Sequence, residues 1–245
     1  MINYIDLATK AELLRKHFNE DNNSPIDIFS LSQEIENLTL IFYPMESNLS
    51  GMCIKNKHNN CIIAINSSMT IGRQRFSLAH ELYHMFYDSN MINVCSKKIY
   101  FEKGNESERK ADIFASFFLM PRVALIEKVE KLLGNDKMNL SLEDIIKIEQ
   151  HFGVSHQTAL YQLYNCNCIS KKELDEYLNK SVIKIAARNG FNIELYNPTN
   201  ESKQHFTYGQ YINLINKALA HNLISNGKYE ELLIEAFKSV NYGKI

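Results

Sequence analysis

The stretch RFSLAHELYH, residues 75–84, contains one complete H-E-x-x-H motif. Residues four apart lie on the same face of an α-helix, so His80 and His84 can direct their imidazole nitrogens at one metal ion. Glu81 lies beside them and can accept a proton from a water molecule at that ion, as in metal-assisted hydrolysis. The motif therefore predicts a helix that carries a zinc site, with Glu81 as the catalytic base.

The residues around the motif matter because the pattern alone occurs by chance in roughly one chain of this length in a hundred. No Pro or Gly lies between Arg73 and Asp88, so a helix can run through the whole stretch. Apolar residues recur there at helical spacing: Leu78, Ala79, Leu82, Met85 and Phe86. This pattern is typical of a buried helix that carries ligands.

The composition is that of a globular protein with a substantial core: 245 residues, 45% hydrophobic, with a formal charge of −1. This charge gives no electrostatic reason to expect nucleic acid or an anionic membrane as a partner. The N-terminus lacks the features of a signal peptide, and no apolar stretch approaches ~18 residues, so we expect a cytoplasmic protein. The five cysteines are an odd number without zinc-hook spacing, and we expect reduced packing residues.

The first 66 residues predict a mixture of helices and strands. Helices are predicted at residues 4–18 and 24–36, and strands at residues 38–43, 51–55 and 61–66. The second helix has Ser24 as its expected N-cap and Pro25 at its first position. Residues 61–65 are apolar on both faces, which leaves two interpretations: a buried strand, or an edge strand that pairs with an extended peptide.

Another helix is predicted at residues 105–120, where Pro121 ends it. A catalytic zinc ion usually has three protein ligands and the motif supplies two, so a third ligand should lie outside it. The candidates on this helix are Glu106, Glu108 and Asp112.

Glu108 and Asp112 are four residues apart, on a helical face whose other residues are small or apolar. Each of them also has an alternative role. Glu108 has the spacing of a capping box with Asn105, and Asp112 could pair with Arg73 or Arg75. The spacing alone leaves these alternatives open.

The two helical segments together resemble the ImmA/IrrE family of zinc metallopeptidases. The resemblance is carried by H-E-x-x-H at residues 80–84, E-x-x-A-D-x-F-A at residues 108–115 and L-M-P at residues 119–121. It further implies a limited, site-specific cut in a protein partner, a cytoplasmic transcriptional repressor of the helix-turn-helix type, often from a phage or mobile element.

The resemblance also implies roles for individual residues. His80, His84 and Glu108 would bind one catalytic zinc ion, with Glu81 as the base. The E-x-x-x-D spacing is similar to that of the wider thermolysin-like group, in which the aspartate supports the first histidine. We therefore expect Asp112 to accept a hydrogen bond from the ring nitrogen of His80 that does not bind zinc.

Residues 139–168 have the pattern of a helix-turn-helix segment, with Gly153 at the turn and Ser155 as the next N-cap. A recognition helix needs polar side chains at base edges and cations near the phosphates. Residues 155–162 contain no Arg or Lys, and the preceding helix carries Glu143, Asp144 and Glu149. We therefore expect no specific binding of duplex DNA. Such a segment is also a feature of the resembled family.

The C-terminal residues predict further helices. A capping box at Ser170 and Glu173 begins a helix that should end at Asn189 and Gly190. The remaining predictions are a short strand at residues 191–196 and helices at residues 208–222 and 226–240.

These elements predict an α+β fold in which a small mixed or antiparallel sheet packs on the zinc helix. The expected parts are a zincin-like domain at residues 1–135, a helix-turn-helix-like segment at residues 139–168 and a helical region at residues 169–245. The expected function is a zinc-dependent metalloendopeptidase. The alternative is a non-proteolytic antirepressor or toxin-antitoxin-type binding partner with a structural zinc site. Glu81 favours the enzyme, because a structural site gains nothing from a base beside its ligands.

Overall fold

The computed structural model describes residues 2–46, 48–89, 91–96, 105–134, 139–201 and 204–237. Its strands are β1 (Leu38–Tyr43), β2 (Leu49–Lys55), β3 (Cys61–Asn66), β4 (Ile92–Ser96) and β5 (Phe206–Gly209). They form one mixed sheet in the order β4-β2-β3-β1-β5, in which only β1 and β3 run parallel to each other. The chain is therefore an α+β protein, as the sequence predicts.

The helices occupy the rest of the described chain. The first five are α1 (Tyr4–His17), α2 (Ile28–Gln33), α3 (Ile71–Tyr87), α4 (Glu106–Leu119) and α5 (Arg122–Leu133). They are followed by α6 (Leu142–Phe152), α7 (His156–Asn165), α8 (Lys171–Leu178), α9 (Val182–Arg188), the 3₁₀ turn η1 (Glu194–Tyr196), α10 (Gln210–Ala220) and α11 (Asn226–Ala236).

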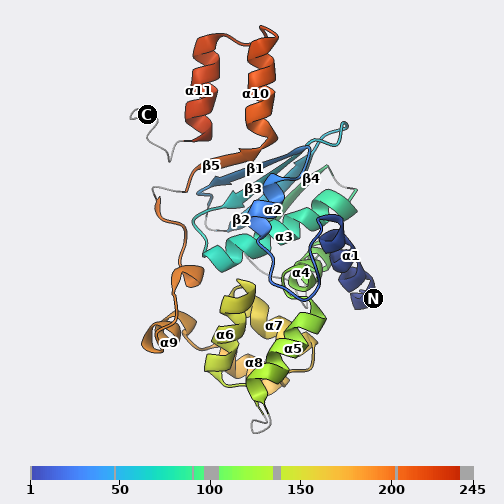
Figure 1. The fold of residues 1–245 in the computed structure, drawn as a ribbon, viewed down its shortest axis with the longest axis vertical. Helices are drawn as coiled ribbons and strands as arrows, with labels where there is room; N and C mark the ends of the chain where they lie inside the picture. Colours follow the sequence, from blue (N-terminus) through green and yellow to red (C-terminus); the bar gives the residue numbers. More distant parts are fainter. Residues whose placement is uncertain are drawn as a thin grey trace.

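The elements are stacked in layers (Figure 1). Helices α2 and α3 cover one face of the sheet, and α4 lies against α3 with α1 beside it. Helices α5 to α8 form a lobe below α4, whereas the α10–α11 hairpin stands at the opposite end of the molecule, beyond β5. Helix α3, which carries the H-E-x-x-H motif, is thus enclosed between the sheet and α4.

Alternation along the strands explains which face of the sheet is covered. Leu40 of β1 and Ile63 of β3 are fully buried on the helical side, whereas Ile62 points the other way and is 42% exposed. Strand β3 pairs with β2 on one side and with β1 on the other. The interpretation of residues 61–65 as a peptide-binding edge strand is therefore wrong, and burial explains the apolar character of all of them except Ile62.

Helix α3 is fixed by its N-cap and by its apolar face. The Thr70 hydroxyl accepts a hydrogen bond from the backbone N–H of Arg73 at 3.3 Å. Phe76, Leu78 and Leu82 are completely buried, and each contributes roughly 1.5–3 kcal/mol through burial of its side chain. The helix is therefore a rigid platform for the motif.

Helix α2 begins later than the sequence predicts. Its N-cap is Asp27, which accepts a hydrogen bond from the backbone N–H of Ser30, and Ser24 lies in the preceding loop. The Ser24 hydroxyl donates to Asp21 at 2.9 Å, and the Ser24 carbonyl accepts from Arg15 at 2.6 Å. The N-cap prediction at Ser24 is wrong because contacts with Arg15 of α1 and with Asp21 of the loop hold this residue outside the helix.

Two strands were not predicted from the sequence, β4 and β5. No element was predicted between residues 89 and 104, and residues 97–104 of this stretch lie outside the described residues. The strand predicted at residues 191–196 is wrong, because this segment is bound to α6 and ends in η1. The Gln150 amide donates to the Asn192 carbonyl at 2.7 Å, and the Tyr196 hydroxyl donates to Glu149 at 2.7 Å.

The C-terminal helices differ from the prediction in their bounds. The helix expected from Ser170 to Asn189 is divided into α8 and α9, and the Asn179 side chain at the break donates to the Asp175 carbonyl at 2.7 Å. Helix α10 begins at Gln210 because the preceding residues form β5. Residues 238–240, the expected end of the last helix, lie outside the described residues.

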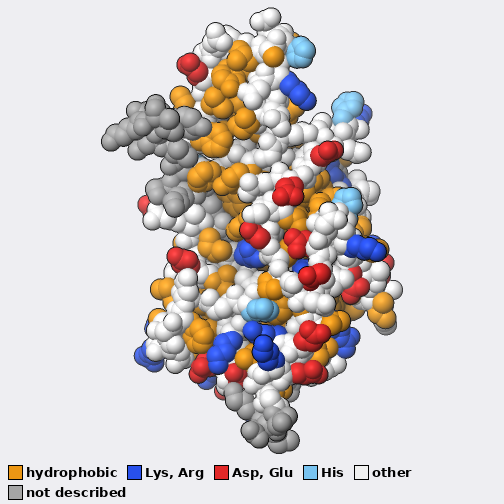
Figure 2. Space-filling model, in the orientation of Figure 1, with side chains coloured by type: hydrophobic (Ala, Val, Ile, Leu, Met, Phe, Trp, Pro, Cys, Tyr) orange, Lys and Arg blue, Asp and Glu red, His pale blue; other side chains and the backbone are white. Residues whose placement is uncertain are grey.

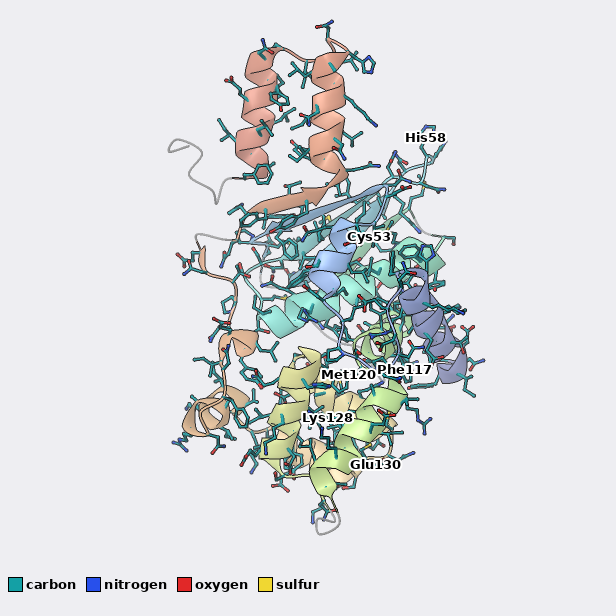
Figure 3. The ribbon with its side chains drawn as sticks, viewed as in Figure 1. Cys53, His58, Phe117, Met120, Lys128 and Glu130 are labelled. Carbon is teal, nitrogen blue, oxygen red and sulfur yellow. The ribbon has the colours of Figure 1, made fainter. Side chains whose placement is uncertain are left out.

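The five cysteines are free thiols, as predicted. Figure 3 shows Cys53 within the sheet and His58 at the tip of the turn between β2 and β3.

On the face seen in Figure 2, apolar side chains gather over the α10–α11 hairpin, and basic and acidic side chains intermingle over the lower helices. Among the described helices, none combines the length and apolar character that crossing a membrane requires.

Candidate metal centre

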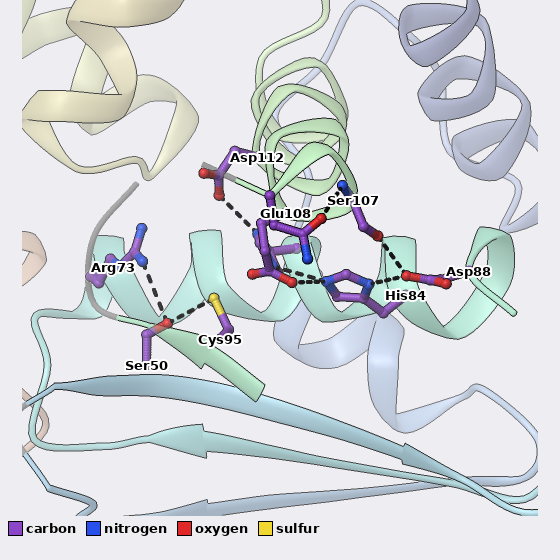
Figure 4. A network of polar contacts seen from close by, with 10 residues as sticks. Ser50, Arg73, His84, Asp88, Cys95, Ser107, Glu108 and Asp112 are labelled. Atoms are coloured by element: carbon purple, nitrogen blue, oxygen red, sulfur yellow. Dashed lines mark hydrogen bonds and ion pairs between the residues drawn. The ribbon is translucent and has the colours of Figure 1, made fainter. Parts of the chain in front are cut away.

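His80, His84 and Glu108 meet at the contact between α3 and α4 (Figure 4). The two histidine Nε2 atoms are 3.1 Å apart. The Glu108 carboxylate lies across both rings, with Oε2 3.3 Å from Nε2 of His80 and Oε1 3.3 Å from Nε2 of His84. Three potential ligand atoms from two helices therefore surround one point.

These distances can be compared with those around a tetrahedral zinc ion. Bonds of about 2.0–2.1 Å in tetrahedral geometry place neighbouring ligand atoms about 3.3 Å apart. The two Nε2 atoms are 3.1 Å apart, and each lies 3.3 Å from a different oxygen of the Glu108 carboxylate, so the site is close to this spacing. The donor set of two imidazoles and one carboxylate also suits zinc, so the residues present fit the ion that the motif implies.

The sequence did not decide which residue is the third ligand. Of the two candidate glutamates, Glu106 and Glu108, the structure places only Glu108 at the site. Glu106 is on the exposed side of α4 and pairs with Lys110 at 2.7 Å. Asn105 caps the helix by accepting from the backbone N–H of Ser107, while the Glu108 side chain lies with the histidines. The capping-box alternative for Glu108 is therefore wrong.

Carboxylates contact the outer nitrogens of both histidines. Asp112 Oδ1 lies 2.8 Å from Nδ1 of His80, which is the contact expected from the sequence. Asp88 Oδ2 lies 3.0 Å from Nδ1 of His84 and also accepts from the Ser107 hydroxyl at 2.6 Å. Such partners fix the tautomer and orientation of a metal-binding imidazole. Asp88 was not singled out in the sequence, although it is four residues after His84.

Hydrogen bonds favour the ionised form of Glu108. Burial of this carboxyl group opposes ionisation, but the contacts with His80 and His84 outweigh burial and lower its pKa to about 2. Glu108 is therefore a carboxylate at neutral pH, the form that can bind a metal ion.

Glu81 is in a different environment. Its side chain is fully buried, and neither carboxylate oxygen has a hydrogen-bond partner among the described residues. Burial raises the pKa of this carboxyl group well above its usual value. A Cβ atom at Gly51 of β2 would lie only 3.0 Å from Oε1 of Glu81, so the glycine leaves room for the carboxylate against the sheet.

Sequence reasoning missed a thiol beside this site. Potential ligand atoms of His80, Glu81 and Cys95 lie within 4.8 Å of one another. Cys95 is on β4 and accepts a hydrogen bond from the Ser50 hydroxyl at 3.1 Å, and Arg73 donates to the same hydroxyl at 3.4 Å (Figure 4). No spacing in the sequence indicated this contact, because it depends on the pairing of β4 with β2.

Comparison with known proteins places the chain in a family. No curated protein matches it. Residues 26–164 match the model of the IrrE N-terminal-like domain, Peptidase_M78, which covers more than half of the 245 residues. The match includes the H-E-x-x-H motif, Glu108 and Asp112. The chain therefore belongs to the IrrE N-terminal-like domain family, Peptidase_M78, a family of the metallopeptidase type.

Proposed function

We propose that this protein is a zinc-dependent metalloendopeptidase, in which His80, His84 and Glu108 bind one catalytic zinc ion and Glu81 is the general base. The observation that carries the proposal is the convergence of His80, His84 and Glu108 beside a fully buried carboxylate. The two Nε2 atoms are 3.1 Å apart, and each lies 3.3 Å from one oxygen of Glu108. Family membership supports the same reaction class.

The roles of the protein groups follow from their positions. A zinc ion at this site would polarise the peptide carbonyl and the attacking water. Glu81 accepts one proton from the water as its oxygen attacks the carbonyl carbon, and returns that proton to the amide nitrogen as the C–N bond breaks. A carboxylate whose pKa is raised by burial is a stronger base than an exposed one.

The alternative of a structural zinc site has less support. Structural zinc sites are closed by four protein ligands, whereas catalytic sites combine three protein ligands with an open position. Among the described residues, His80 and His84 group with Glu108, and Cys95 groups instead with His80 and Glu81. The set of three ligands thus favours the enzyme over a binding partner with structural zinc.

For the substrate, we propose a cytoplasmic helix-turn-helix repressor that is cut once.

We also propose that the helix-turn-helix-like segment of this protein, residues 139–168, has a structural role and does not bind DNA. Thr158 and Gln162 of α7 are fully buried, and the Gln162 amide donates to the Met120 carbonyl at the end of α4. Figure 3 shows Met120 where α4 meets the lower lobe. Polar side chains that hold two helices together are not free to contact base edges.

A repressor encoded beside this protein is the substrate to test. With zinc present, we expect two fragments whose masses add up to the intact repressor plus one water, and we expect EDTA to prevent the cut. Intact-mass spectrometry measures both results. If the repressor stays whole while an unfolded protein such as casein is cleaved, the peptidase assignment stands and the substrate is wrong. If neither is cleaved, the enzyme proposal fails as well.

Removal of the carboxylate behind His80 should weaken zinc binding. In Asp112→Ala, the ring nitrogen of His80 loses its partner, and we expect zinc affinity to fall by about 10–100-fold with the fold intact. Competition with a chromophoric chelator measures the affinity. Glu106→Ala is the matched control, because this residue is on the same helix and its side chain is 65% exposed. Equal affinity in the two variants would contradict the role of Asp112.

A further inference from the structure

A cavity separate from the metal centre lies where the C-terminal part of the chain meets the core. It has a volume of about 340 Å³, which is within the range of small-molecule sites, roughly 300–1,000 Å³. Helix α2, strand β1 and the first turns of α3 form one side, and Thr199 and β5 form the other. The family match ends at residue 164, so three of the eight described lining residues come from the region outside it.

Four of the eight described residues that line the cavity are aromatic. The rings of Phe29 and Phe42 meet edge to face, with centroids 5.4 Å apart. Phe42 and Tyr208 also meet edge to face at 6.1 Å, and Tyr208 stacks on Phe206 at 5.6 Å. Aromatic rings interact most favourably in these offset and edge-to-face arrangements. A flat ring placed among them can make contacts of the same kind.

One hydroxyl group in the lining has no partner. Ser67 is 1% exposed, and its Oγ makes no hydrogen bond within the described part of the chain. A buried hydroxyl without a partner is unfavourable, and most such groups in folded proteins are satisfied. A polar group on a bound molecule could supply the missing hydrogen bond.

The neighbouring amide indicates which polar group would fit. The Gln74 Nε2 donates to the carbonyls of Ser67 and Met69, at 3.2 and 2.6 Å, and to the Thr199 hydroxyl at 3.2 Å. Its donors are therefore used, while Gln74 Oε1 has only a long contact of 3.5 Å with Thr199. Two groups in the lining can still accept a hydrogen bond: the Ser67 hydroxyl and the Gln74 Oε1 atom. A ligand that donates a hydrogen bond therefore fits best.

Charge excludes ionic ligands from this cavity. None of the described residues that line it is charged. Moving an ion into such an environment without a partner would be strongly unfavourable. A neutral molecule is therefore the appropriate class.

We propose that this cavity binds a small, neutral, planar aromatic molecule with one N–H or O–H donor, of the indole or phenol type. The ring lies among the four aromatic side chains, and its donor bonds to the Ser67 hydroxyl. This site is independent of the metal centre, so its test does not depend on peptidase activity.

Indole is a suitable probe, because the chain contains no Trp and indole fluorescence can be excited selectively beside its 13 Tyr residues. Titration of the full-length protein against indole should give a saturable blue shift with 1:1 stoichiometry and a dissociation constant below about 1 mM. We expect 1-methylindole, which lacks the donor, to bind about tenfold more weakly, the usual value of one hydrogen bond.

Two adjacent serines provide a matched pair of variants. Ser67→Ala should weaken indole binding about tenfold and leave 1-methylindole binding unchanged. The unliganded variant should melt at the same temperature as the parent or higher, because it loses an unsatisfied hydroxyl. Ser68 is exposed and does not line the cavity, so Ser68→Ala should bind both probes like the parent.

Two results would overturn the proposal. The first is indole emission that stays that of free indole throughout the titration. The second is equal indole affinity in Ser67→Ala and the parent, which would place the probe elsewhere on the protein.

Discussion

Substitution of Glu81 by Gln is expected to reduce peptide cleavage by about 10³-fold without reducing the amount of bound zinc. Gln has nearly the same shape as Glu but cannot accept the proton of the attacking water at neutral pH. The three expected ligands lie on other side chains, so the metal site should stay intact. Metal stoichiometry by mass spectrometry and cleavage rate are to be measured on the same preparation.

Variants of the expected zinc ligands should behave differently from Glu81→Gln, because they should lose the metal as well as the activity. In His84→Ala and Glu108→Ala, we expect both the metal and the activity to be lost, because each change removes one of three ligands. A Glu81→Gln protein that still cleaves its substrate at the normal rate would point to a mechanism without this base. A Glu108→Ala protein that binds zinc as tightly as the parent would place the third ligand elsewhere.

Loss of Arg15, which lies outside the metal centre, should reduce stability strongly. It is fully buried and donates to three backbone carbonyls: those of Phe118 at 2.7 Å, Asp21 at 2.6 Å and Ser24 at 2.6 Å. In Arg15→Ala, these acceptors lose a charged donor and a cavity remains. We expect the free energy of unfolding to fall by about 3–5 kcal/mol, measured by urea denaturation.

The next residue provides the control for this experiment. Lys16 is exposed on the same turn of α1, and Lys16→Ala should change the free energy of unfolding by less than about 0.5 kcal/mol. Arg15→Lys keeps the charge but not the planar fork of donors, so it should lie between the parent and Arg15→Ala. If Arg15→Ala and Lys16→Ala were equally stable, the three carbonyls would not depend on the guanidinium.

Sequence reasoning succeeded where local interactions decide the structure. Asn105 begins α4 as an N-cap, and Gly153 ends α6 in the left-handed conformation with φ of 64°. The four-residue spacing of His80 and His84 placed their nitrogens together, as helical geometry requires. Each of these features depends on residues within about one helical turn.

Prediction from the sequence failed where contacts between distant segments decide the structure. Strands β4 and β5 are short, and their conformation comes from pairing with β2 and β1. The start of α2 depends on Arg15 of another helix, and Cys95 reaches the metal centre only through the sheet. Spacing alone left Glu108 among three candidates, because the packing of α4 on α3 decides which carboxylate meets the histidines.

The pairing of β5 with β1 has a consequence for synthesis of the protein on the ribosome. Thr39 lies opposite Gly209, whose positive φ of 79° and close approach to the Leu38 carbonyl leave no room for a side chain. Until residue 209 has emerged, the outer edge of β1 has no partner in the nascent chain. Unpaired edges recruit other chains, so the growing polypeptide exposes an aggregation-prone edge during this interval.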